Sequence, residues 1–189
     1  MKNLIKITLM LVVIVFTSNT SFAQKKIKVN KNDYIQLINQ LNEIEKEKKA
    51  INKNLKTFDE LDYNVFSNQQ WERLHESHAD NVIVNWPDGH RTYGLERHIN
   101  DLKFLFVFAP DTRIKTHPIR IGDGNLTAVM GIMEGTFTKP MPVGDGKVVQ
   151  PTGKSFSIPM ATIGRWKDGE MIEEYLFWDN KTYYEQLGL

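Results

Sequence analysis

The residues with the clearest chemical potential lie near the C-terminal end of the chain. A predicted strand over Met171 to Trp178 alternates so that Tyr175 and Phe177 share one face with Asp179. If that face is concave, Asp179 is a partly desolvated acid, which is how a protein obtains a general acid/base near neutral pH. The alternative is that Asp179 caps a short helix over residues 180–186, because Asp is a favoured N-cap residue.

His117 is the candidate partner for this acid. It lies in a predicted strand over Thr112 to Ile121, on the face that also carries Arg113 and Lys115. If this face lines a pocket, His117 could approach Asp179, and the carboxylate would orient the imidazole for proton transfer. The alternative is an exposed strand residue.

The histidine spacing does not predict a metal site. His75 and His78 lie three apart in a predicted helix over Gln69 to His78, and Asp80 follows. A structural zinc site would need further ligands from elsewhere, and the chain has no Cys and no His-Glu-x-x-His pattern. We therefore expect no metal and no organic cofactor.

Aromatic residues are abundant, and a subset is expected to line an apolar cavity for a flat or hydrophobic ligand. His98 follows Gly94 on a predicted helix and is expected near the pocket mouth, whereas Arg165 could orient a carbonyl or carboxylate group. As alternatives, Arg165 is a solvated strand residue and most aromatic rings belong to the core. The expected ligand-binding residues are Trp86, His98, Phe137, Arg165, Tyr175 and Phe177.

The first 23 of the 189 residues resemble a secretory signal. Lys2 and Lys6 precede an apolar run over Ile7 to Phe16, and Ser21-Phe22-Ala23 forms a small-residue cleavage site. The apolar run is short for a membrane span, so we expect export to the periplasm or medium without stable membrane insertion. Removal of these residues leaves 22 Lys and Arg against 23 Asp and Glu, a net charge of −1, which argues against nucleic acid as a partner.

The remaining pattern predicts an α+β fold. Apolar residues recur every three or four positions from Tyr34 to about Phe66, which predicts one long helix or two. A second helix is expected over Leu95 to Val107, and antiparallel strands follow it, interrupted by a long loop over Thr138 to Gly153. Helices followed by a meander of strands predict one curved antiparallel sheet with helices on a single face.

Several short motifs follow one another along the chain. They are Trp86-Pro87-Asp88-Gly89, Gly94-Leu95-Glu96-Arg97-His98, Ala109-Pro110-Asp111, Gly135-Thr136-Phe137-Thr138, Pro151-Thr152-Gly153-Lys154, Arg165-Trp166-Lys167-Asp168-Gly169, and Asp179 with Gln186-Leu187-Gly188. In this order they resemble the motifs of the SnoaL-like polyketide cyclase and ester cyclase family, which belongs to the nuclear-transport-factor-2-like (NTF2-like) superfamily.

The resemblance implies a cone with a pocket at its open end, whose concave face carries the helices. It also implies ring closure by an aldol condensation without a cofactor, with Asp179 in the place of the family's acid/base aspartate. Phe137 and Lys139 replace the His and the second Gly of the family's Gly-Thr-His-Thr-Gly motif. The implied organisation is a signal over 1–23, a helical extension over 24–53 and a SnoaL-like domain over 54–189.

The sequence therefore predicts an exported domain that binds a small hydrophobic or carbonyl-bearing molecule. Acid/base catalysis of the cyclase or isomerase type is one hypothesis, and a binding protein without turnover is the second. The third is an interaction module, in which the N-terminal helix pairs with a partner or with a second copy to form a homodimer.

Overall fold

A computed structural model describes residues 30–189, and the expected signal sequence lies outside this range. The chain divides into two units between Asn39 and Gln40. The described part of the first unit contains the start of helix α2 (Lys31–Glu60), and the second unit contains everything that follows. None of the described helices is both long enough and apolar enough to span a membrane.

The predicted helix over Tyr34 to Phe66 is confirmed, but its last turns widen. After α2 the chain continues as the π-helix η1 (Leu61–Phe66). Phe58, at the end of α2, is 1% exposed, and within η1 both Leu61 and Asp62 are buried. π-helical turns often mark functional positions in helices, and this one places a carboxyl group inside the molecule.

The short helix after η1 ends earlier than the sequence predicts. It is the 3₁₀ helix η2 (Trp71–Glu76), and strand β1 (His78–Asn85) begins directly afterwards. His78 is thus a buried strand residue rather than a helix residue at the surface.

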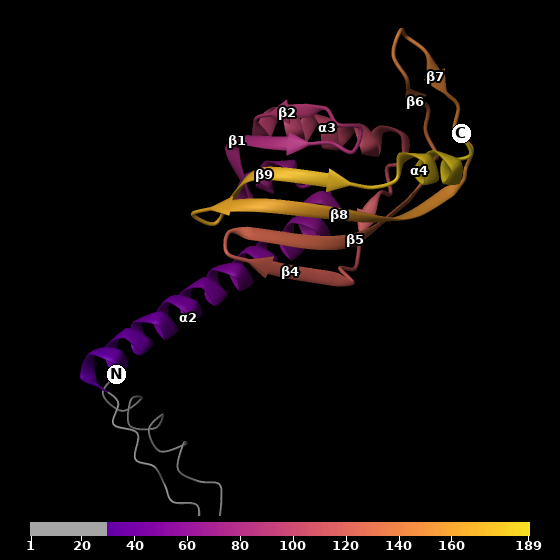
Figure 1. Ribbon diagram of the computed structural model, residues 1–189. Helices are drawn as coiled ribbons and strands as arrows, with labels where there is room; N and C mark the ends of the chain where they lie inside the picture. The colour runs from indigo at the N-terminus through magenta and orange to yellow at the C-terminus, as the bar shows by residue number, and fades with distance from the viewer. Residues whose placement is uncertain (1–29) are drawn as a thin grey trace, which may run out of the picture. The chain divides into compact units, whose positions relative to one another are not determined.

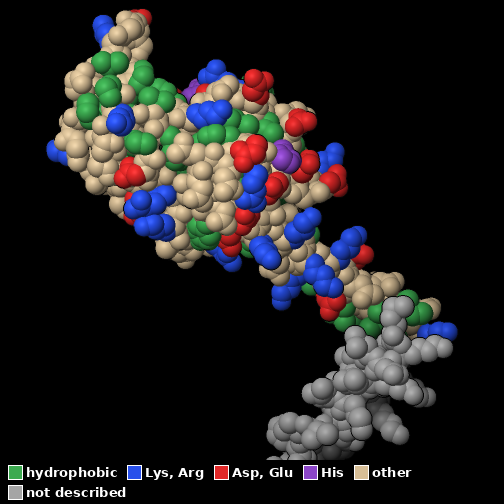
Figure 2. All heavy atoms as spheres, turned by 180° about the vertical axis from the view of Figure 1, so that it is seen from behind, with side chains coloured by type: hydrophobic (Ala, Val, Ile, Leu, Met, Phe, Trp, Pro, Cys, Tyr) green, Lys and Arg blue, Asp and Glu red, His purple; other side chains and the backbone are tan. Residues whose placement is uncertain are grey.

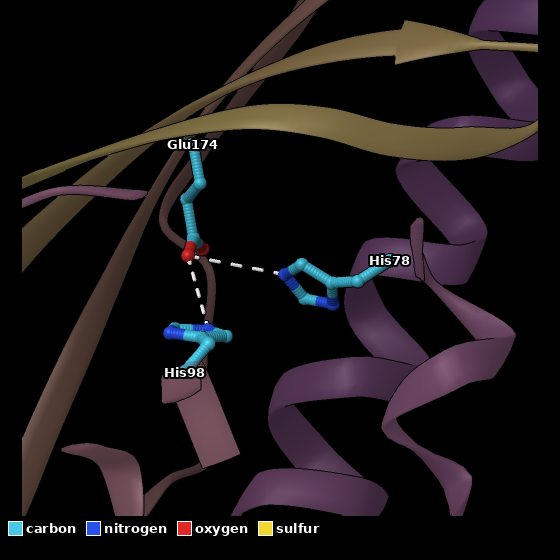
Figure 3. Close-up of side chains that lie close together, drawn as sticks. All are labelled: His78, His98 and Glu174. Atoms are coloured by element: carbon cyan, nitrogen blue, oxygen red, sulfur yellow. Dashed lines mark ion pairs between the residues drawn. The ribbon is translucent and has the colours of Figure 1, made fainter. Parts of the chain in front are cut away.

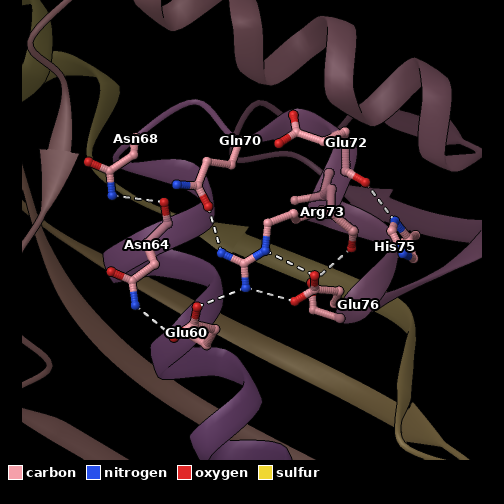
Figure 4. A network of polar contacts seen from close by, with 10 residues as sticks. Glu60, Asn64, Asn68, Gln70, Glu72, Arg73, His75 and Glu76 are labelled. Carbon is pink, nitrogen blue, oxygen red and sulfur yellow. Dashed lines mark hydrogen bonds and ion pairs between the residues drawn. The ribbon is translucent and has the colours of Figure 1, made fainter.

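An arginine holds η2 against the end of α2. Arg73 donates to Glu60 at 2.9 Å, to Gln70 at 2.6 Å and to both carboxylate oxygens of Glu76 at 2.9 Å (Figure 4). Asn64 donates to the other oxygen of Glu60 at 2.6 Å. This network joins the end of α2 and η1 to η2, and its residues lie on both sides of Asp62 and just before His78 in the chain.

One curved sheet carries the rest of the fold (Figure 1). Its order is β2-β1-β9-β8-β5-β3, and β4 also pairs with β5. Only the β1–β9 pair is parallel among the described pairs. The further strands of the sheet are β2 (Arg91–Tyr93), β3 (Arg113–Ile114), β4 (Ile119–Asp123), β5 (Leu126–Thr136), β8 (Ser155–Lys167) and β9 (Glu170–Phe177).

Two details differ from the predicted strands. The expected strand over Thr112 to Ile121 is divided into β3 and β4, and Pro118 lies in the gap because proline cannot donate to a ladder. The predicted long loop contains a small hairpin, β6 (Met141–Pro142) and β7 (Val148–Val149).

Helix α3 (Leu95–Phe108) packs on β1 and β2, and helix α4 (Asn180–Leu187) packs on β8. The core lies between the sheet and the helical segments and includes Phe58, Phe106 and Met133. The predicted α+β architecture, a curved antiparallel sheet with helices, is thus confirmed. On the face seen in Figure 2, Lys and Arg side chains are interspersed with Asp and Glu, consistent with the near-neutral charge.

Candidate functional site

A small cavity opens between the sheet and the helical segments. Its volume is about 30 Å³, which is room for roughly two water molecules. Most of its lining is apolar, and only Trp86, Leu105 and Trp178 among the lining residues are partly exposed, which locates the mouth. The lining comprises Leu61, Asp62, Phe66, His78, Trp86, His98, Leu102, Leu105, Ile114, Met133, Met160, Thr162, Glu174, Leu176 and Trp178.

Three titratable side chains from three elements meet in this cavity (Figure 3). His78 comes from β1, His98 from α3 and Glu174 from β9, and their ligand atoms all lie within 4.8 Å of one another. Oε2 of Glu174 lies 3.2 Å from Nε2 of His98 and 3.8 Å from Nε2 of His78. All three residues are buried, with Glu174 only 4% exposed.

The polar atoms of this triad are incompletely satisfied. Nε2 of His78, Nδ1 of His98 and Oε2 of Glu174 are buried without a hydrogen-bond partner within the protein. Buried polar groups are nearly always hydrogen-bonded, so Nε2 of His78 and Oε2 of Glu174, which face each other at 3.8 Å without partners, point to a ligand there.

Burial and the neighbouring groups act in opposite directions on the pKa values of the triad. It lowers the pKa of His98 to about 4, despite the opposing effect of the Glu174 carboxylate, so this imidazole is neutral at pH 7. Burial raises the pKa of Glu174, but the two facing histidines outweigh it and leave that pKa below its ordinary value. The site therefore combines a neutral imidazole with an ionised carboxylate.

A second pair of groups reaches the same cavity from the helical side. Asp62 lines the cavity, and its Oδ2 lies 2.8 Å from Nε2 of His117. Nδ1 of His117 lies 2.8 Å from Oδ1 of Asp59, which also pairs with Arg120. The His117 ring is 0% exposed and stacks on Tyr63 at 4.4 Å between ring centroids.

This arrangement gives Asp62 an unusual proton affinity. Burial raises the pKa of Asp62 above its ordinary value, and the hydrogen bond from His117 only partly offsets that effect. Because both ring nitrogens of His117 face carboxylate oxygens, the Asp59–His117–Asp62 cluster needs two protons to fill its two hydrogen bonds. One of them can reside on either His117 or Asp62.

Asp179 and His117 do not form the predicted pair. Asp179 is exposed and caps α4, where its carboxylate accepts from the Lys181 backbone N–H at 2.9 Å and from the Thr182 hydroxyl at 2.8 Å. These bonds hold the pKa of Asp179 below its ordinary value. Within residues 30–189, no hydrogen bond or ion pair joins Asp179 to His117, so the cap, which was the alternative interpretation, is the role the structure gives Asp179.

The prediction for β9 chose the wrong face of the strand. Tyr175 and Glu173 lie on the face away from the cavity, where the Tyr175 hydroxyl donates to Glu173 at 2.8 Å. Arg165 donates to the same carboxylate at 3.1 Å, and Phe177 is 49% exposed. The residues of β9 that face the cavity are Glu174 and Leu176, and Trp178 follows with the same parity.

Of the remaining residues predicted to bind the ligand, two line the cavity and one does not. Trp86 and His98 do line the cavity. Phe137 is fully buried in the core, where its ring meets Phe108 edge-on at 5.9 Å, and it is not a lining residue.

Sequence reasoning missed His78, Glu174 and Asp62. Glu174 had a detectable signal, since it shares strand parity with the apolar residues Leu176 and Trp178. Asp62 had one too, because it follows Phe58 by four positions within an apolar helix face.

Several solved structures share this fold. IdmH from Streptomyces antibioticus, a candidate polyketide cyclase, is 26% identical, with a TM-score of 0.61, over 72% of this chain and 99% of its own. A candidate SnoaL-like polyketide cyclase from Jannaschia sp. CCS1 is 19% identical, with a TM-score of 0.63, over 72% of this chain and 92% of its own. A candidate polyketide cyclase from Xanthomonas campestris pv. campestris is 12% identical, with a TM-score of 0.63, over 73% and 98%.

These similarities establish the NTF2-like fold predicted from the sequence. The family model for the SnoaL-like polyketide cyclase matches residues 56–187 of this chain. The chain therefore belongs to the SnoaL-like polyketide cyclase family. Among curated protein sequences, none matches it.

Proposed function

We propose that this protein binds a small carbonyl-bearing molecule in the central cavity and catalyses proton transfer on it. Asp62 would be the acid/base, and His117 would share its proton. The observation that carries the proposal is the position of Asp62, which is buried in the cavity wall, has a raised pKa and contacts His117 at 2.8 Å. Membership of the family and similarity to IdmH support this class of chemistry.

The proposed step abstracts a proton from the carbon next to the carbonyl group. The C–H bond breaks, its electron pair moves into the C–C bond, and the carbonyl electrons move onto oxygen to give an enolate. The proton passes to Asp62, whose ionised form is stabilised by the hydrogen bond with His117 at 2.8 Å. A base works best when its pKa lies near the operating pH, and burial moves the pKa of Asp62 in that direction.

The cavity limits what can bind. A molecule larger than about two waters requires the lining side chains to move. Met133 and Met160 lie in the lining, and methionine is the apolar side chain that adapts most readily to a new shape. The proposed ligand is therefore small, with its carbonyl group among the polar residues and its apolar part against these methionines.

Hydrogen exchange tests the proposal without knowledge of the natural substrate. A panel of small ketones in D₂O is followed by ¹H NMR, and the protein is expected to accelerate exchange of the α-protons above the buffer rate. Asp62→Asn should reduce that acceleration by about 10²–10⁴-fold, the usual contribution of a general base. Asp111→Asn is the matched control, because Asp111 is an exposed carboxylate that accepts from the Thr136 backbone N–H.

Equal exchange by wild type and Asp62→Asn would remove the assignment of Asp62. If the wild type binds a ketone without accelerating exchange, the second hypothesis, a binding protein without turnover, holds instead.

An interaction role is favoured by a different observation. Along α2, Tyr34, Leu37, Leu41 and Ile44 are each at least 45% exposed, although all four are apolar. A second copy of the chain, forming a homodimer, is the partner proposed for this helix. We also propose that the protein is exported, as residues 1–23 lead us to expect. N-terminal sequencing of the mature protein would test this.

A further inference from the structure

The cavity contains a set of metal-ligand atoms that the proposed proton transfer does not use. Nε2 of His78 and Oε2 of Glu174 have no hydrogen-bond partner, and Nε2 of His98 approaches the same oxygen. We propose that His78, His98 and Glu174 bind a divalent transition-metal ion. This site is separate from the Asp62–His117 pair and does not depend on its role.

The distances suit such an ion. Zinc binds imidazole nitrogen and carboxylate oxygen at about 2.0–2.2 Å, so neighbouring ligand atoms in a tetrahedral site lie roughly 3.4 Å apart. The carboxylate oxygen lies 3.2 Å from the His98 nitrogen and 3.8 Å from the His78 nitrogen. Only small side-chain movements would bring the three ligands to one centre.

The hydrogen bonds behind His78 prepare it to be a ligand. The Ser77 hydroxyl donates to the Leu74 carbonyl at 3.0 Å, and the same oxygen lies 2.9 Å from Nδ1 of His78. Since serine has one hydroxyl proton and the carbonyl can only accept, Nδ1 of His78 carries the hydrogen and donates to Ser77. The other ring nitrogen, Nε2, is then the atom of His78 that can bind an ion, and it points toward Glu174 (Figure 3).

Nε2 of His78 and Oε2 of Glu174 lie 3.8 Å apart, too far for a hydrogen bond, and both atoms are buried without a partner in the protein. A divalent ion satisfies both atoms and balances the buried carboxylate. Hydrogen bonding of the second ring nitrogen is also how metal-ligating histidines are usually held.

Two imidazoles and one carboxylate define the chemical class of the ion. Zinc enzymes use this ligand set and keep the fourth position for water or substrate, and non-haem iron(II) sites use it with more open positions. The cavity has room for about two waters, so one or two positions on the ion would remain available.

Metal binding is measured directly on the purified protein after removal of metals by a chelator. Isothermal titration with Zn²⁺, and with Fe²⁺ under anaerobic conditions, should show about one ion per chain, and the melting temperature should rise with ion concentration. Co²⁺ as a probe should give visible absorption bands from an ordered imidazole and carboxylate site. Saturation by any of these ions at this site supports the proposal.

Variants identify the ligands. Glu174→Gln should abolish the saturable binding, and Ser77→Ala should weaken it by about 10–100-fold because it removes the support behind His78. His75→Ala is the control, since His75 is an exposed histidine that contacts the Glu72 carbonyl. Circular dichroism checks the fold, and Ser77→Ala gives a result even if Glu174→Gln does not fold.

Absence of saturable binding by the wild-type protein would overturn the proposal. So would unchanged affinity in both Glu174→Gln and Ser77→Ala. Loss of binding in His75→Ala alone would place the ion at the surface. Failure here leaves the hydrogen-exchange result with Asp62→Asn unaffected, so the two proposals can fail separately.

Discussion

Removing the imidazole of His117 should destabilise the fold by leaving a buried carboxylate without its partner. In His117→Leu the replacement is apolar and of similar size, so packing against Tyr63 is largely kept while both hydrogen bonds at 2.8 Å are lost. Asp59 keeps Arg120 and is partly exposed, so its loss is small. Asp62 is 6% exposed and retains no comparable partner.

The expected loss in the free energy of unfolding follows from this difference between Asp59 and Asp62. Breaking a buried charge pair by removing one member costs about 3–5 kcal/mol, because the remaining charge is uncompensated. The Asp62→Leu/His117→Leu double variant should recover most of this loss, since replacing both members of a buried pair by apolar groups is often neutral. Urea unfolding, followed by tryptophan fluorescence, measures the free energy of unfolding of the wild type, of His117→Leu and of the double variant.

The pH dependence provides an independent check. Burial already raises the pKa of Asp62, and loss of His117 removes an influence that lowers it, so the folded single variant retains this proton to higher pH than the unfolded chain. The part of the penalty that comes from ionisation of Asp62 is therefore absent below the ordinary carboxyl pKa and grows as pH rises, by about 1.4 kcal/mol for each unit between the unfolded and folded pKa values. His117→Leu should be closer to wild type at pH 5 than at pH 8.

Two results would refute this reasoning. One is an equal cost of His117→Leu at pH 5 and pH 8, which would mean that the lost interaction is packing rather than charge. The other is a double variant as unstable as the single variant, which would mean that Asp62 is not the group left uncompensated.

Three further predictions concern other parts of the chain. Asp179→Ala should lower the melting temperature, whereas Asp179→Asn, which keeps a capping oxygen, should stay near wild type; a loss of ketone hydrogen exchange in Asp179→Asn would contradict the cap assignment. Gly135→Ala should cost about 1–3 kcal/mol in urea unfolding, because its new carbon would lie 2.8 Å from the ring of Phe156, and an unchanged midpoint would show that this ring moves freely. Deletion of residues 24–53 should reduce a dimer to a monomer by light scattering, and an unchanged oligomer would exclude the helix as the dimer interface.

The order of elements was predictable because it follows from local patterns. Apolar spacing predicted the long helix and alternation predicted the strand that forms β9, whereas the division of the strand around Pro118 into β3 and β4 was not predicted. The π-helix at Leu61–Phe66 was not predictable in this way, since its buried residues Leu61, Val65 and Phe66 keep the spacing expected of an α-helix. The hairpin β6–β7 was hidden for a similar reason, as two-residue strands carry no periodic signal.

The site was harder to predict because it depends on which face of an element is buried. Tyr175 lies on one face of β9, and Trp178 follows the strand on the side of the other face. Aromatic content alone therefore could not show which face lines the cavity. A shift of one residue reverses every side chain in a strand, which is why Asp179 was placed beside the pocket and Glu174 away from it. His78, His98 and Glu174 also lie far apart in the sequence. Only the fold brings these three residues together, so the sequence alone does not show that they meet.

One feature of the sequence nevertheless distinguishes the acidic residues of the site from the other acidic residues. Asp62 lies with Phe58, Leu61 and Val65 at the spacing of one helix face, and Glu174 lies with Leu176 in the alternation of one strand face. An acid in the register of the apolar residues is carried into the core with them, where an isolated charge is too costly to persist. Such an acid must be protonated, paired or bound to an ion. In this protein Asp62 meets His117, and Glu174 faces two histidines with its oxygen unsatisfied, so the two acids in apolar registers are also the two that open into the cavity.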